Sequence, residues 1–189
     1  MTLSRLAIDS GYEAPAVYGW ARRAGFAQVA PVKGVEGFNR ASPVSGPTFV
    51  DATDGGRRLR RGARLWTVAV ATFKAETYRF LRLDRAGDVP MTDGGPSPSD
   101  RVHLPGWIDS EWVRQLVAEQ LVTVKTKRGF QKLEWQKLRE RDEALDCRVY
   151  ARAADWIAGT DRWPERKWAE MERELGVPVR FVGVGEKAE

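Results

Sequence analysis

Apolar residues in the first half of the chain form short runs typical of strands and spacings typical of helices. The run at 3–8 predicts a short buried strand, and residues 13–24 place apolar side chains three and four positions apart, which predicts a helix. A glycine- and proline-containing stretch at 35–48 predicts a loop. Further strands are expected at 27–32, 48–52 and 65–72.

The second half predicts a hairpin between helices. A helix is expected at 111–117, with Asp109 or Ser110 as its cap. The clearest helical pattern covers 142–158 and precedes a charged extension at 160–189. The remaining expected elements are helices at 73–83 and 164–175, and hairpin strands at 119–126 and 130–136. This order predicts an α/β fold: one domain over 1–159, built as a mixed sheet flanked by helices.

Composition narrows the chemistry. The chain has 189 residues, one cysteine and one histidine, which excludes disulfide scaffolds and zinc sites rich in cysteine or histidine. The formal net charge of +5 permits a polyanionic partner without requiring one. No apolar run approaches the ~18 residues needed to span a bilayer, and no signal peptide pattern is present, so we expect a soluble protein of a reducing compartment.

Two aspartates stand where apolar residues are expected. Asp9 ends the first strand before a Ser-Gly pair, a position that opens onto binding crevices in α/β sheets, although an ordinary turn aspartate is the alternative. Asp146 lies three and four residues before Val149 and Tyr150, on or beside the apolar stripe of its helix. A buried carboxylate costs several kcal/mol unless it is paired or binds a cation.

Neighbouring acids strengthen this expectation. Asp142 and Glu143 share one side of the helix with Asp146, although their position at the helix start is also favoured by its dipole. Glu119, at the start of its strand, is a further candidate and could equally be solvent-facing. Such carboxylates become favourable around a hard divalent cation such as Mg²⁺ or Mn²⁺. Paired metals of this kind cleave phosphodiesters without histidine or cysteine.

Four segments follow one another along the chain: LAIDSGYEAPAVYGWARRAG with APVKG after it, LWTVAVATFKAETYRFL, HLPGWIDSEWVRQLVAEQL and RDEALDCRVYARAADW. In this order they resemble the nuclease domain of lambda-type phage terminase large subunits. The last is the most specific, although Arg141-Asp142 replaces the family's usual Arg-Asn. Together they cover about residues 4–158. Some relatives carry an aspartate at the end of the middle strand, where this chain has Ala71-Thr72.

The resemblance implies an RNase H-like (RuvC-like) fold and a metal-dependent endonuclease that cuts concatemeric double-stranded DNA during genome packaging. It implies Asp9 and Asp146 as metal ligands, Glu119 as the middle ligand and Glu143 as a nearby acid, around what we expect to be two Mg²⁺ or Mn²⁺ ions. The implied partners are the terminase ATPase domain, the small subunit and the portal or procapsid, in the host cell cytoplasm. The chain lacks a Walker A motif, so we expect a separate nuclease domain and not the motor.

Basic residues supply candidate DNA contacts. Lys33 and Lys74 match lysines of the family, and two basic clusters lie at 57–64 and on the predicted hairpin. The cluster at 57–64 is either a solvated loop or a phosphate contact, and we hypothesise a phosphate contact for the hairpin cluster; such contacts would be sequence-independent. The candidates in these clusters are Arg57, Arg58, Arg60, Arg61, Lys125, Lys127 and Arg128.

Two rival functions stay open. A non-catalytic DNA-binding or packaging module of the same fold would account for the missing middle-strand aspartate. Another RNase H-like nuclease, such as a junction resolvase, would account for the missing ATPase. A D146N variant separates the first rival, because only a nuclease would lose its activity while still binding DNA.

Overall fold

The computed structural model describes residues 3–82, 102 and 104–176. Its first sheet has the order β1-β2-β4-β3. Strands β1 (Leu6–Asp9), β2 (Val29–Val35) and β4 (Arg57–Ala69) run parallel, and β3 (Val44–Asp54) pairs antiparallel with β4 at the edge. The predicted α/β class with a mixed sheet flanked by helices is confirmed at this level.

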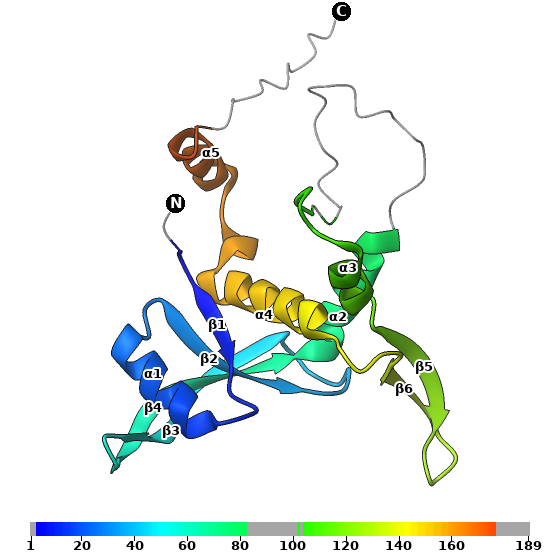
Figure 1. Cartoon of the computed structure of the whole chain (residues 1–189), viewed down its shortest axis with the longest axis horizontal. Helices are drawn as coiled ribbons and strands as arrows, with labels where there is room; N and C mark the ends of the chain where they lie inside the picture. The colour runs from blue at the N-terminus through cyan, green and yellow to red at the C-terminus, as the bar shows by residue number, and fades with distance from the viewer. Residues whose placement is uncertain (1–2, 83–101, 103, 177–189) are drawn as a thin grey trace, which may run out of the picture.

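Helices cover both faces of this sheet (Figure 1). Helix α1 (Ala14–Ala24) connects β1 to β2 and packs on β2, β3 and β4. Helix α4 (Glu143–Ala158) packs on β1 and β3 and on helix α2 (Val70–Arg82). The core between α4 and the sheet is built from buried side chains, among them Val32, Val68, Phe73, Leu145 and Val149.

A second, two-stranded sheet projects from this body. Strand β5 (Glu119–Lys125) pairs antiparallel with β6 (Gln131–Lys137), which confirms the predicted hairpin. Helix α3 (Ser110–Leu116) precedes it, and Asp109 caps this helix by accepting a hydrogen bond from the Trp112 amide at 2.8 Å. The short η1 (Thr160–Arg162) and α5 (Glu165–Glu174) follow α4.

The long β3–β4 hairpin corrects two expectations. Strand β3 already begins at Val44, within the stretch predicted as a loop. Pro47 is tolerated there because β3 is an edge strand and its register shifts between Ser45 and Thr48. The arginine run at 57–61 is likewise not a loop, because it opens strand β4.

The junction after β4 also differs from its prediction. Strand β4 ends at Ala69 and α2 starts at the next residue, with no glycine or proline to mark the change. The side chain of Lys74 therefore emerges from the first turns of a helix that continues directly from the sheet. Residues 87–98, whose glycines and prolines also predict a loop, lie outside the described residues, as do His103 and the segment after 176.

Candidate active site

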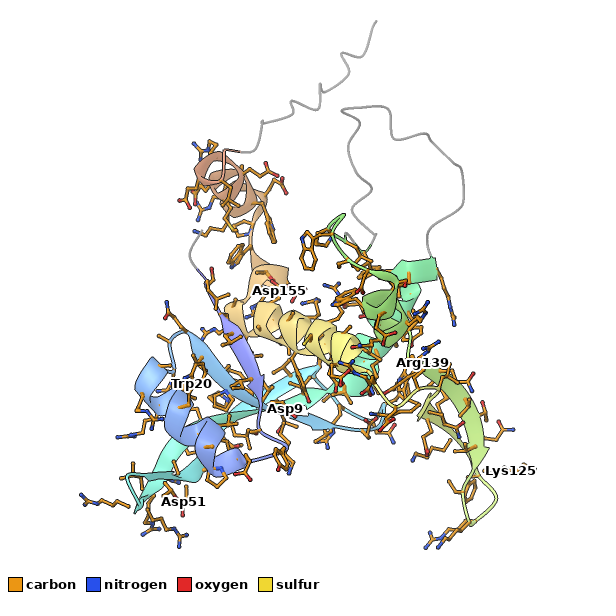
Figure 2. All side chains as sticks on the ribbon, viewed as in Figure 1. Asp9, Trp20, Asp51, Lys125, Arg139 and Asp155 are labelled. Atoms are coloured by element: carbon orange, nitrogen blue, oxygen red, sulfur yellow. The ribbon has the colours of Figure 1, made fainter. Side chains whose placement is uncertain are left out.

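Asp9 lies where the carboxyl ends of the parallel strands meet (Figure 2). The backbone after it is held by Ser10, whose amide and hydroxyl both donate to the Val32 carbonyl, at 2.9 and 2.8 Å. The exposed Asp9 carboxylate accepts the Gly11 amide at 3.1 Å. A Cβ on Gly11 would lie 3.1 Å from Asp9 Oδ2, so the glycine leaves room for the carboxylate to fold over the turn.

Tyr150 connects this strand end to α4. Its hydroxyl donates to Asp9 Oδ1 at 3.4 Å. A Cβ on Gly34 would lie 2.9 Å from the Tyr150 oxygen, so only glycine in β2 admits the ring at this depth. Burial raises the pKa of Tyr150 far above its ordinary value, and the charges of Asp9 and Asp146 raise it further. Tyr150 is therefore a protonated donor between two carboxylates.

Asp146 lies one turn before Tyr150 on α4 and is half-buried. Burial raises the pKa of Asp146, the charge of Asp142 raises it further, and Lys74 and Lys137 oppose the shift. Among the described residues its carboxylate has no hydrogen bond and no ion pair. The half-buried position confirms the reasoning that placed Asp146 on the apolar side of its helix.

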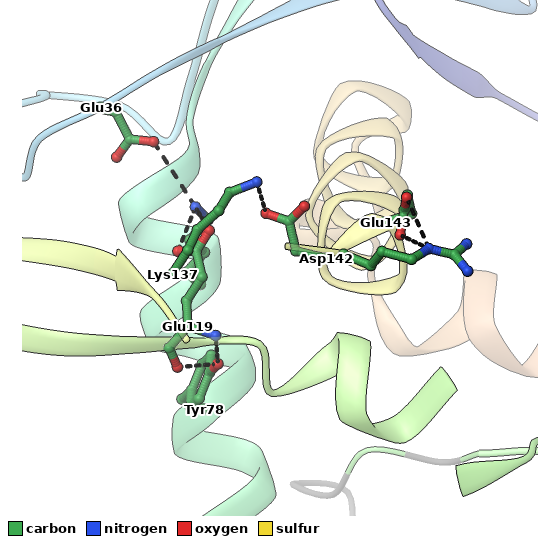
Figure 3. Close-up of polar contacts among 8 residues, drawn as sticks. Glu36, Tyr78, Glu119, Lys137, Asp142 and Glu143 are labelled. Atoms are coloured by element: carbon green, nitrogen blue, oxygen red, sulfur yellow. Dashed lines mark hydrogen bonds and ion pairs between the residues drawn. The ribbon is translucent and has the colours of Figure 1, made fainter. Parts of the chain in front are cut away.

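Glu119, by contrast, is fully paired. Its side chain is 4% exposed, and its two carboxylate oxygens accept from Lys74 Nζ at 2.9 and 2.8 Å. Glu36 lies 3.9 Å from the same ammonium group. Tyr78 accepts from the Glu119 amide and donates to its carbonyl, which fixes the start of β5 against α2 (Figure 3). A phosphate contact by Lys74 would require this pair to open.

The two acids at the start of α4 diverge (Figure 3). Asp142 is buried and forms an ion pair with Lys137 at 2.6 Å. Its side chain accepts no hydrogen bond from the backbone amides at the start of α4. Glu143 is exposed and pairs with Arg141 at 3.3 Å. The charge of Asp142 thus reaches Asp146, whereas Glu143 faces solvent beside an arginine.

A cavity of about 290 Å³ opens beside this charged group, between the β5–β6 hairpin and the end of β2. Glu119, Lys137 and Glu36 contribute charged groups to its wall, and Phe38 and Trp135 contribute aromatic ones. The cavity therefore lies on the side of the carboxylates that faces the β5–β6 hairpin.

The donor set can be compared with what a hard cation needs. Within residues 3–82, 102 and 104–176, no three Asp, Glu, His or Cys side chains are gathered closely enough to hold a metal ion. Mg²⁺ is commonly held by one or two carboxylates with waters and substrate phosphates. Asp9 and Asp146 fit that pattern, since neither contacts a cationic side chain among the described residues, and the two lysines that oppose the pKa shift of Asp146 act on it without contact.

Apart from the buried Lys74 on α2, the basic candidates lie at two hairpin tips and on β2. Lys33 is exposed on β2 next to Val32, the register partner of Asp9. The arginine tip (Arg57, Arg58, Arg60, Arg61) and the lysine tip (Lys125, Lys127, Arg128) are exposed. Asp9, at the centre of Figure 2, lies between Asp51 near the first tip and Lys125 at the second.

Strand geometry gives the reach of both tips. Asp9 is level with Trp66, nine residues from Arg57 along β4, or roughly 30 Å at 3.3 Å per residue. Lys125 is six residues from Glu119, or roughly 20 Å. At the arginine tip Arg58 pairs with Asp51 at 2.6 Å, and the Arg61 amide donates to the same carboxylate at 3.0 Å. These two contacts lower the pKa of Asp51, the amide of Arg61 having the larger effect.

Sequence comparison places these residues in a known group. The model of the terminase large subunit gpA endonuclease domain matches residues 1–168. The chain belongs to the terminase gpA endonuclease-domain family. The large terminase subunits of Escherichia phage lambda and Enterobacteria phage P21 are 32% and 33% identical to it over 164 residues, which are 86% of this chain.

The match is to one part of those relatives. The chain spans 23% of the length of each phage large subunit. No solved structure matches the chain significantly. Within the part of the chain that the structure describes, no helix is long and apolar enough to cross a membrane.

For this terminase-family domain, sequence reasoning missed how three residues are used. Tyr150 was expected only as part of the apolar stripe, and its hydrogen bond to Asp9 was not predicted. Its spacing of four residues from Asp146, which places both on one face of the helix, is the signal that could have shown its role. Lys137 is only five residues before Asp142, but the two residues lie on either side of the irregular segment between β6 and α4, where no regular spacing predicts a contact. Glu36 lies between two predicted elements and reaches Lys74 through the fold.

Proposed function

We propose that this terminase-family domain is a metal-dependent endonuclease that cuts concatemeric double-stranded DNA during phage genome packaging. The observation that carries the proposal is the half-buried Asp146, which contacts no cationic side chain among the described residues and whose charge acts on Tyr150, the hydrogen-bond donor to the strand-end Asp9. Family membership supports the endonuclease class.

Asp9 and Asp146 are the residues that would hold Mg²⁺ or Mn²⁺, with two ions expected. When bound there, divalent cations would supply an activated water and stabilise the leaving oxygen of the phosphodiester. Glu119 is a further candidate ligand, and it would have to release Lys74 to act as one. Glu143, predicted as a nearby acid, is exposed and already paired with Arg141, so we expect at most a minor role for it.

The residues around the carboxylates have definable tasks. The hydroxyl of Tyr150 donates to Asp9 and holds the orientation of that carboxylate. Partial burial of Asp146 lowers the local dielectric constant, which strengthens its attraction for any cation. Lys137 and Lys74 neutralise Asp142 and Glu119, so that the negative charge of the site stays concentrated on Asp9 and Asp146.

The basic hairpin tips would bind the duplex on either side of the site. A reach of roughly 30 Å on one side covers about nine base pairs at 3.4 Å each. The contacts go to phosphates, so they position DNA without reading its sequence. Lys33, next to the register partner of Asp9, is placed for a phosphate nearer the site.

We further propose an RNase H-like fold for the domain, with a boundary at 159 where α4 ends, and a charged extension after it. The ATPase domain, the small subunit and the portal or procapsid would be its partners, in the host cell cytoplasm. A non-catalytic DNA-binding module is the second candidate, and the closed Lys74–Glu119 pair is the observation that favours it.

Plasmid cleavage with Mg²⁺, Mn²⁺ or EDTA tests the proposal, with D9N and D146N beside the wild type. Metal-dependent nicking that both variants lose, with DNA binding retained, is the expected result. A wild type that binds DNA but does not cleave in either metal would contradict an autonomous nuclease. Preference for four-way junctions over linear duplex would indicate a resolvase.

A further inference from the structure

A second cavity lies away from the carboxylates, at the amino ends of the parallel strands. Its volume is about 400 Å³, and its wall is formed by Arg5, Phe26, Ala27, Val29, Arg64 and Trp66. Arg5 is four residues before Asp9, so the Arg5 end of the cavity lies roughly 13 Å from that carboxylate along the direction of β1, whereas Trp66 is level with Asp9 two strands away. Nothing in the proposed cleavage uses these residues.

The wall of this cavity is cationic. It includes two arginines and no carboxylate. Arg5 donates through Nη1 to the Phe26 carbonyl at 3.1 Å, while its Nε is buried and has no hydrogen-bond partner among the described residues. Because Nε is closed off from solvent, an anion in the cavity would be bound through the terminal nitrogens of Arg5.

Flat groups line the same cavity. Phe26 and Trp66 contribute rings to the wall. The guanidinium carbon of Arg64 lies 6.0 Å from the Phe26 ring centre and 5.8 Å from that of Phe49, the cross-strand partner of Arg64. An arginine held between two rings is oriented before any ligand arrives. Rings and arginine planes together are the usual platform for unpaired bases.

We propose that this cavity binds one unpaired nucleotide of single-stranded DNA, its phosphate against Arg5 and Arg64 and its base against Phe26 and Trp66. The volume is within the range of small-ligand sites, and the aromatic wall would have no use in a site for phosphate alone. The proposal rests on the proposed function only in taking DNA as the polymer. The cavity would then bind a DNA strand that has separated from the duplex near the cleavage site.

The test measures binding of a fluorescein-labelled thymidine tetranucleotide to the full chain, in EDTA, by fluorescence anisotropy. A blunt duplex is titrated in parallel. R5Q and R64Q should each weaken tetranucleotide binding about tenfold, the usual loss for one hydrogen bond to a charged group. F26L tests the base contact and should also weaken it, while R166Q on the exposed α5 is the matched control and should bind like the wild type.

Salt dependence adds a second readout. Loss of one phosphate contact should lower the slope of log K against log salt by about 0.7 for a single strand. Absence of wild-type binding at millimolar protein, or equal losses for tetranucleotide and duplex in R5Q and R64Q, would overturn the proposal. Because EDTA removes cleavage from the assay, failure of the nucleotide site and failure of the nuclease proposal are distinguished.

Discussion

Glu119 and Asp146, two carboxylates near the carboxyl ends of the parallel strands, differ in whether a lysine contacts them. Glu119 is buried and both of its oxygens contact the ammonium group of Lys74. Asp146 is half-buried, and the lysines near it contact Glu119 and Asp142 instead. The chain therefore supplies the counter-charge at Glu119 and leaves Asp146 without one, which is the arrangement expected where a cation is to be bound from outside.

The largest effect should come from the uncompensated carboxylates. D9N and D146N should each abolish plasmid cleavage, because they remove a ligand charge while keeping side-chain size. E143Q is the matched control on the same helix, and it should retain most of the activity because Glu143 is exposed and paired with Arg141. Full activity in D146N would contradict the contrast between Glu119 and Asp146, because Asp146 would then have no catalytic role.

The next effect concerns the compensated carboxylate. K74M should lower the free energy of unfolding by about 3–5 kcal/mol, because it leaves the buried charge of Glu119 unpaired. The double variant K74M/E119L should recover most of this loss, since an apolar pair of similar volume replaces the ion pair. Urea denaturation measures both. An unchanged midpoint in K74M would show that the pair is already open in solution.

Removing charge at the hairpin tips should have a smaller effect. R57Q and K127Q, one at each tip, should each lower the salt slope of duplex binding by about 0.9. The two losses should add, because the tips lie on different sheets. Filter binding at several salt concentrations checks this, and a change confined to one tip would place the duplex on that side alone.

The smallest expected effect is that of D146N on how the thermal stability of the protein depends on pH. The pKa of Asp146 is raised in the folded protein, mainly by burial, so its ionisation weakens the fold as the pH rises from the ordinary value toward the raised pKa, and the full loss is present above it. D146N should therefore unfold at a slightly higher temperature than the wild type at neutral pH. The difference should shrink as the pH falls toward the ordinary value of 3.8 and vanish below it. Scanning calorimetry between neutral and acidic pH measures this, and a D146N protein less stable at neutral pH would contradict the assigned shift.

Local patterns predicted the elements that depend on local chemistry. The helix capped by Asp109, the β5–β6 hairpin and α4 were all predicted to within a few residues. The position of Asp146 was also predictable, because helical periodicity places a residue on a face without knowledge of its neighbours.

Other features depend on residues far apart in sequence. Lys74 and Glu119 are 45 positions apart, and no local signal distinguishes a buried lysine from one that contacts phosphate. The β3–β4 hairpin was hidden because Pro47 and the surrounding glycines indicate a loop unless the strand lies at an edge. The β4–α2 junction has no breaking residue, so only tertiary packing sets it at Ala69.

Titration of Mn²⁺ into the wild type, D146N and E143Q, followed by calorimetry, tests the central claim most directly. If Asp146 is a ligand of a bound divalent cation, the wild type and E143Q should bind Mn²⁺ with similar affinity, and D146N should lose binding. Equal binding by D146N and the wild type would contradict the account, because the cation would then be held without the carboxylate that the fold leaves uncompensated.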